Sequence, residues 1–144
     1  MIAGTPDGVD AAVARSKELG VRRATMLNVG GAFHTPLMAS ARDGLVTTLA
    51  GIGFAPPRAP IVSNEDGAAY DDGDGWRTRL PEHVTRPVRW RTSMETLVSC
   101  GADAFVEVGH GSMIAGVAKR TLPQTPVLAC GTPAECARLP EGAS

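Results

Sequence analysis

Aromatic residues are scarce in this sequence, at 4% of 144 residues, so it offers no platform on which bases or sugars could stack. Its 14 lysines and arginines face 15 aspartates and glutamates, and this near-neutral balance gives no basic surface for nucleic acid. No apolar run approaches the roughly 20 residues that a membrane-spanning helix needs, and the amino terminus lacks a secretion-signal pattern. We therefore expect a soluble, cytoplasmic protein without nucleic-acid or membrane partners.

Metal and cofactor motifs are also missing. The three cysteines, Cys100, Cys130 and Cys136, form no CxxC pair, and the three histidines do not fall at zinc-site spacing. The aspartates at 71–74 do not match a calcium-binding loop and read as a solvated segment. We expect unpaired thiols in a reducing compartment, no metal and no cofactor.

Helix-like and strand-like segments alternate along the chain. Apolar spacing, caps and breakers predict helices over 5–19, 36–50, 87–100 and 111–120. Runs rich in apolar and β-branched residues predict strands over 22–29, 59–64, 104–109 and 126–130. This alternation is typical of a layered α/β fold with mostly parallel strands. We expect an irregular segment over 71–83, with at most one short helix from Trp76, and a loose tail from Gly131.

His34 lies in GGAFHTPLM, directly after a predicted strand and before a predicted helix. Ligands of α/β folds bind at the carboxyl ends of strands, and the small residues before His34 leave room for a close approach. A histidine at a helix start can also be a residue satisfied by the local backbone. The residues by themselves therefore predict half of a site, a general base without an activated nucleophile.

The other two histidines give weaker signals. His83 lies four residues before Pro87 in a predicted loop, where a lone histidine reads as a surface residue. His110 lies in VGHGSM, which fails the G-x-S-x-G pattern of a nucleophile elbow because Ile114 stands two residues after Ser112. The glycine turn there can bind an anion at the start of the next helix or merely turn the chain, and the structural reading is favoured.

Four motifs, in this order, resemble the carboxy-terminal half of malonyl-CoA:acyl carrier protein transacylases: GAFHTPLM, PIVSNEDG, HVTRPVRWRTSMETL and FVEVGHGSMIAGVAKR. The related acyltransferase domains of polyketide synthases share this pattern, and the likeness runs over 2–128. It implies part of an α/β-hydrolase-like acyltransferase subdomain together with the end of an inserted ferredoxin-like subdomain. On this resemblance, 1–29 are the last helix and strand of the small subdomain, 30–130 the carboxy-terminal portion of the large one, and 131–144 a loose tail.

The resemblance also implies roles for particular residues. In the family, a serine in a GHSxGE elbow attacks the malonyl thioester, and a histidine removes its proton and later activates the carrier protein's phosphopantetheine thiol. His34 matches that histidine. His83 matches the residue whose backbone carbonyl orients the base, where glutamine or asparagine is also usual. Phe33, in the A-F-H pattern, implies a preference for malonyl over methylmalonyl units.

The sequence departs from the family in lacking the GHSxGE elbow, the oxyanion-hole glutamine motif and the malonyl-binding arginine segment. It therefore holds no nucleophile, and we expect the isolated chain to be inactive and marginally stable. Two alternatives stay open. One is a non-catalytic module that binds a carrier protein or partner subunit, with the arginines between 77 and 91 as a candidate surface. The other is one half of a split acyltransferase whose amino-terminal half is separately encoded.

Overall fold

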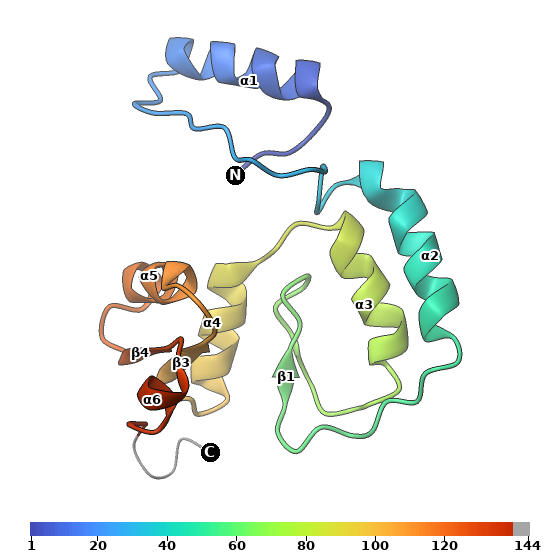
Figure 1. Cartoon of the computed structure of the whole chain (residues 1–144), viewed down its shortest axis with the longest axis vertical. Helices are drawn as coiled ribbons and strands as arrows, with labels where there is room; N and C mark the ends of the chain where they lie inside the picture. The colour runs from blue at the N-terminus through green and yellow to red at the C-terminus, as the bar shows by residue number, and fades with distance from the viewer. Residues whose placement is uncertain (140–144) are drawn as a thin grey trace.

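A computed structural model describes residues 1–139, and its elements are spread over the whole of that range (Figure 1). In chain order they are α1 (Pro6–Glu18), η1 (Pro36–Met38), α2 (Ala39–Leu49), β1 (Ile61–Val62), β2 (Ala69–Tyr70), α3 (Trp76–Thr85), α4 (Trp90–Ser99), β3 (Phe105–Val108), α5 (Met113–Thr121), β4 (Val127–Cys130) and α6 (Pro133–Cys136). Within this range, no helix is long and apolar enough to cross a membrane.

The strands form two small sheets rather than one layered sheet. β1 pairs antiparallel with β2, with Ile61 opposite Tyr70. β3 pairs parallel with β4, with Phe105 opposite Val127, and α5 connects them while packing on both strands. The α/β prediction holds, but the expectation of mostly parallel strands is correct only for the second sheet. In Figure 1, α4, α5 and α6 gather around that sheet, while α2 and α3 lie side by side beyond it.

The predicted strand over 22–29 is wrong. The segment has no strand partner among the described residues, and it leaves the side chains of Met26, Leu27 and Val29 more than half exposed. A strand needs a neighbour for its backbone hydrogen bonds, and local β propensity cannot supply one. The preceding helix α1 forms as predicted, capped by Thr5 and started by Pro6, yet it buries none of its residues.

Residues 131–139 are more ordered than the sequence suggested, because they contain α6. The hydroxyl of Thr132 accepts from the backbone N–H of Glu135, and the Glu135 carboxylate accepts from the N–H of Gly131. This T-x-x-E arrangement is a variant of the capping box, which marks the start of a helix. The glycines and alanines of the tail obscured this helix-start signal in the sequence. The remainder of the predicted loose tail, 140–144, lies outside the described residues.

A disulfide joins Cys130 and Cys136, so the expectation of unpaired thiols is wrong for these two residues. The turn from β4 into α6 brings the two cysteines together. The sequence contains no cysteine-spacing motif that would predict this disulfide. Cys100 is a free, exposed thiol.

Candidate active site

His34 lies in a tight turn that leads into η1 and α2. The next residue, Thr35, caps η1: its hydroxyl accepts from the backbone N–H of Leu37 at 3.3 Å and donates to the carbonyl of Ala32 at 2.7 Å. The bond to Ala32 reaches back across His34, and the bond from Leu37 lies directly after it in the chain. Threonine before proline is a typical helix start, so the sequence itself fixes this turn.

The backbone of His34 adopts φ 63°, the only positive value at a non-glycine residue in the described part of the chain. This left-handed conformation costs a non-glycine residue on the order of 1–3 kcal/mol and persists where the surroundings hold it. Here the backbone N–H of His34 donates to the carbonyl of Val84, in the last turn of α3, at 3.0 Å. Strain of this kind concentrates at functional sites.

The imidazole of His34 is held by the same helix end. Its Nδ1 lies 2.8 Å from the carbonyl oxygen of His83. Because a carbonyl oxygen only accepts, Nδ1 is the donor and carries the proton of the neutral ring. The second ring nitrogen, Nε2, then has its lone pair available, and it makes no hydrogen bond with any residue in the described part of the chain. This is the protonation state that a general base requires.

The carbonyl of His83 can accept from His34 because α3 ends nearby. The last four carbonyls of a helix lack partners within the helix. The residue four positions after His83 is Pro87, which has no N–H to offer. The neighbouring carbonyl of Glu82 is occupied, since it accepts from the N–H of Arg86 at 3.1 Å. The local sequence HVTRP therefore presents an open acceptor at this position.

The structure places His83 in helix α3 and not in the predicted loop. The prediction failed because Pro81 lies inside the helix, where proline removes one backbone hydrogen bond and normally argues against helix. The side chain of His83 faces inward: Nε2 lies 3.0 Å from the hydroxyl of Ser63, and the ring stands edge-on to Trp76 with centroids 6.2 Å apart. Burial lowers the pKa of His83 below its ordinary value of 6.5, against a smaller opposing effect of nearby carboxylates.

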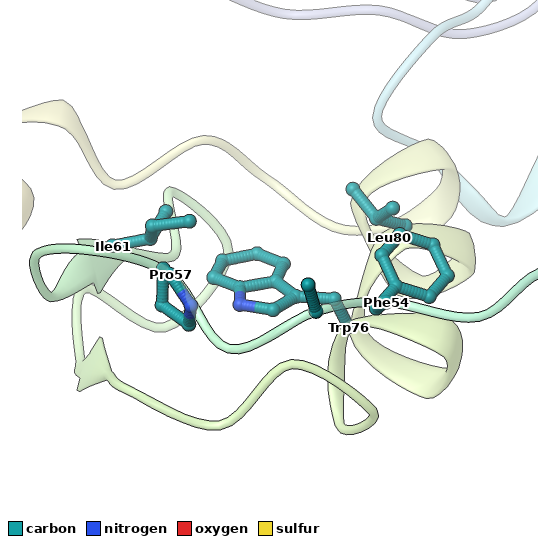
Figure 2. A pocket seen from close by; sticks show the side chains of 6 residues that line it. Phe54, Pro57, Ile61, Trp76 and Leu80 are labelled. Carbon is teal, nitrogen blue, oxygen red and sulfur yellow. The ribbon is translucent and has the colours of Figure 1, made fainter.

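An apolar pocket of about 300 Å³ opens on Trp76, and Figure 2 shows the indole among the side chains that line it. The lining residues are Phe54, Ala55, Pro57, Ile61, Trp76 and Leu80. None of them ionises, so this pocket offers packing surface rather than chemistry. The indole Nε1–H is buried without a hydrogen-bond partner in the described part of the chain.

A second, more polar pocket of about 270 Å³ lies between the η1–α2 segment and α3, the elements that flank His34. It is lined by Pro36, Ala39, Arg42, Glu82, Thr85 and Arg86. Its charges are largely paired, because Arg86 forms ion pairs with Glu65 and Glu82 at 2.9 Å each. The pocket is therefore close to neutral.

Phe33 precedes the strained turn and keeps 49% of its surface exposed. Its ring lies against Gly31, where a Cβ atom would come within 3.2 Å of it. The glycine thus allows the phenyl ring to fold back over the main chain next to His34.

In the described part of the chain, His110 forms no hydrogen bond or ion pair with His34 or His83. The turn that carries His110 is built on Gly109 and Gly111, whose φ values are 138° and 99°. The carboxylate of Glu107 accepts from the N–H groups of Ile114 and Ala115 at 3.1 and 2.8 Å, filling the helix start where an anion would bind. The structural reading of this turn is correct. The sequence gives little local signal for this cap, because Glu107 lies six residues before the start of α5 at Met113.

Two of the three aspartates at 71–74 pair with arginines, as expected of a solvated loop. Asp72 pairs with Arg79 at 2.7 Å and Asp74 with Arg77 at 2.9 Å. Over residues 1–139, no group of three or more candidate ligands could hold a metal ion.

No family model matches this chain. It is similar to the malonyl CoA-acyl carrier protein transacylase of Synechocystis sp., with 38% identity over 123 residues, which are 85% of this chain and 41% of that protein. The corresponding Escherichia coli K12 protein is 37% identical over 120 residues, 83% of this chain and 39% of its own length.

Solved structures show the same likeness. The crystal structure of a Synechocystis malonyl-CoA:ACP transacylase superposes with a TM-score of 0.85 and 34% identity, covering 95% of this chain and 46% of that one. The solved complex of a malonyl-transacylase with its type II polyketide synthase acyl carrier protein also matches this chain. Its TM-score is 0.85 and its identity 30%, over 92% of this chain and 43% of the matched one.

The chain is thus similar to acyltransferases in both sequence and structure. It is a relative of the malonyl CoA-acyl carrier protein transacylases, as the sequence motifs predicted. The chain spans about two fifths of the length of the curated relatives it matches, at 41% and 39%.

Proposed function

We propose that this chain carries the general base of a transacylase that moves a malonyl group from malonyl-CoA to the phosphopantetheine thiol of acyl carrier protein. The observation that carries the proposal is the 2.8 Å contact between His34 Nδ1 and the carbonyl of His83, which leaves Nε2 as the base. Relatives named for this activity match more than four fifths of the chain, at 85% and 83%.

In the first half-reaction, Nε2 of His34 takes the proton of a serine hydroxyl as the serine oxygen attacks the malonyl thioester. The thioester C–S bond breaks, and coenzyme A leaves as the thiol with that proton. In the second half, Nε2 takes the proton of the phosphopantetheine thiol, whose sulfur attacks the malonyl-serine ester. The C–O bond breaks and the serine regains its proton. No cofactor enters either step.

The serine lies in the part of the complete enzyme that this chain does not span, because the sequence holds no GHSxGE elbow. A base without a nucleophile has no covalent path to catalysis, so the chain by itself is inactive in this proposal. A separately encoded amino-terminal half would supply the same serine on another polypeptide. The chemistry assigned to His34 and His83 is the same in both cases.

Phe33 is the proposed specificity residue. Its exposed ring next to His34 would face the α-carbon of the bound acyl group and leave no room for a methyl branch. Steric rejection of one methyl group is worth roughly 1–3 kcal/mol. The proposed site therefore prefers malonyl over methylmalonyl units.

Acyl carrier protein and malonyl-CoA are the partners of this proposal, and the cytoplasm is its location. The disulfide between Cys130 and Cys136 is the feature that argues against that location, since disulfides are rare in reducing compartments.

The alternative function, a module that only binds a carrier protein, is less well supported. Three of the arginines between 77 and 91 are neutralised by carboxylates, namely Arg77, Arg79 and Arg86.

The proposal can be tested in a chimera. The matched 123 residues of the Synechocystis transacylase would be replaced by those of this chain, and malonyl transfer to carrier protein followed by mass spectrometry. We expect transfer by the chimera and a loss of about 10²-fold or more in its His34→Asn variant. Asparagine tolerates positive φ, so this variant removes the base without adding backbone strain.

A folded chimera that transfers no malonyl group, or a His34→Asn variant as active as its parent, would overturn the proposal. The chain by itself serves as the control. Incubated with malonyl-CoA, it should show no covalent malonyl adduct, and an adduct would mean that it holds a nucleophile of its own.

A further inference from the structure

We infer that the side chain of His83 and the hydroxyl of Ser63 are positioning residues for His34. In the proposed function only the main-chain carbonyl of His83 touches the base. The inference rests on that function for its catalytic meaning, but the effect on the His34 ring is measurable without any acyl transfer.

The carbonyl oxygen of His83 accepts the hydrogen bond from Nδ1 of His34. It belongs to the last turn of α3, where the hydrogen-bond ladder no longer holds each carbonyl in place. Arg86 is already extended, with φ −114° and ψ 151°, and Pro87 supplies no donor. The direction of the His83 carbonyl therefore depends on what else holds residue 83.

The side chain of His83 is the element that holds it. Its ring is fixed at one atom by the 3.0 Å contact between Nε2 and Ser63 Oγ, and along one edge by Trp76. Both partners are buried, with Ser63 exposed to 1% and Trp76 to 7%. Because the ring and the carbonyl share one Cα atom, an anchored ring restrains the direction of the carbonyl.

Ser63 is itself firmly anchored. Its backbone N–H donates to Ala68 at 2.9 Å, and its carbonyl accepts from Gly67 at 2.8 Å. The loop it begins is tied to α4, because the N–H of Arg89 donates to the carbonyl of Asn64 at 2.7 Å and the Thr96 hydroxyl donates to that of Gly67 at 2.6 Å. A continuous series of hydrogen bonds thus runs from α4 through Ser63 and His83 to His34.

The competing interpretation is that the bond between Ser63 and His83 only stabilises the fold. Substitutions at these positions separate the two, since every variant keeps the backbone carbonyl of residue 83. The readout is the tautomer of His34, measured by ¹⁵N NMR on the chain itself. Only three histidines contribute signals, and His34→Asn assigns the relevant one.

We expect His34 to be protonated mainly at Nδ1 in the unaltered chain. In His83→Gln this preference should persist, since the glutamine amide offers a donor and an acceptor for the Ser63 hydroxyl in place of the imidazole. In Ser63→Ala and His83→Ala the ratio of the Nδ1–H to the Nε2–H form should fall about two- to tenfold, the worth of one hydrogen bond. Ser93→Ala is the matched control. Ser93 is also buried, at 4% exposure, but among the described residues its hydroxyl donates only to the carbonyl of Arg89, the N-cap of α4.

A variant that leaves one buried polar group without a partner can fail to fold. The double variant Ser63→Ala/His83→Met removes both partners together, which is far less costly, and it should show the same fall in the ratio. An unchanged ratio in the folded double variant would overturn the inference. An equal fall in Ser93→Ala would do the same.

The same substitutions in the chimera give a second readout. Misorientation of the base should lower kcat while the KM for malonyl-CoA stays the same. An inactive parent chimera would contradict the proposed function but would leave the tautomer measurement standing, so the two failures are distinguishable.

Discussion

The backbone N–H of His34 donates to the carbonyl oxygen of Val84 at 3.0 Å, although the two residues lie far apart in the sequence. This bond and the Nδ1 bond to His83 attach His34 to the end of α3 at two points. Together they hold the residue at φ 63°. The position of the ring is thus set by the fold and not by the turn alone.

The strained backbone makes a prediction about stability. His34→Gly should be more stable than His34→Ala by about 1 kcal/mol, because alanine pays the left-handed strain that glycine avoids. Both variants lose the ring and keep the N–H to Val84, so they differ mainly in backbone preference. Urea denaturation of the two proteins measures the difference. Equal midpoints would show that the turn relaxes on substitution.

Phe33 is expected to set substrate choice. In the chimera, Phe33→Ser should raise the ratio of methylmalonyl to malonyl loading by about five- to a hundredfold, because a methyl branch then finds space. Competition between the two thioesters, read by mass spectrometry of the carrier protein, gives this ratio. Phe105→Leu, in strand β3, provides a control of similar chemistry away from His34. An unchanged ratio in Phe33→Ser would remove Phe33 from the specificity assignment.

Glu107 is expected to stabilise the fold through α5. Glu107→Ala leaves the N–H groups of Ile114 and Ala115 without their acceptor, and it should cost about 0.5–2 kcal/mol of unfolding free energy. The exposed Glu95, in α4, is the matched control, and Glu95→Ala should stay close to the parent. Thermal melts followed by circular dichroism compare them. Equal losses in both variants would argue against the capping role.

The lowered pKa of His83 makes stability depend on pH. Burial lowers its folded-state pKa below 6.5, with the carboxylates of Glu65 and Asp66 acting in the opposite direction. The unfolded chain therefore takes up the proton first as the pH falls, and the free energy of unfolding decreases below about pH 6.5 until the folded-state pKa is passed. Above that window the stabilisation is fully present.

Urea midpoints of the parent and His83→Gln at several pH values test this linkage. The parent should lose more stability than the variant as the pH falls from neutrality, because glutamine does not titrate. Parallel losses would place the pH dependence in other groups.

Gly67 is expected to tolerate no side chain. Its φ is 77°, and a Cβ atom would lie 2.5 Å from Cγ2 of Thr92 in α4. Gly67→Ala should therefore cost about 2 kcal/mol or more, from left-handed strain and from the clash. Gly53→Ala is the control, since nothing lies within 4 Å of that Cβ position. A Gly67→Ala variant as stable as the control would mean that the loop can move away from α4.

Local sequence signals determined most of the helices. The caps and prolines at Thr5, Pro6, Thr35 and Pro36 act within a few residues, so the positions of α1 and of the η1–α2 segment follow from short-range chemistry. The motifs also determined the relationship to malonyl transacylases, because spaced residue types are a property of the sequence. The local pattern already singled out His34, and the resemblance implied roles for both His34 and His83.

Only the tertiary structure decided the pairing of strands, the environment of His83 and the joining of Cys130 to Cys136. The segment 22–29 has strand-forming residues but no strand partner within residues 1–139, and strand pairing is a contact between distant segments. Nothing in the sequence distinguishes Ser63 from other turn serines, and only the fold places its hydroxyl 3.0 Å from the half-buried imidazole of His83. Local propensities act over one or two turns of backbone, whereas the site of this protein is built from contacts between segments that only packing brings together.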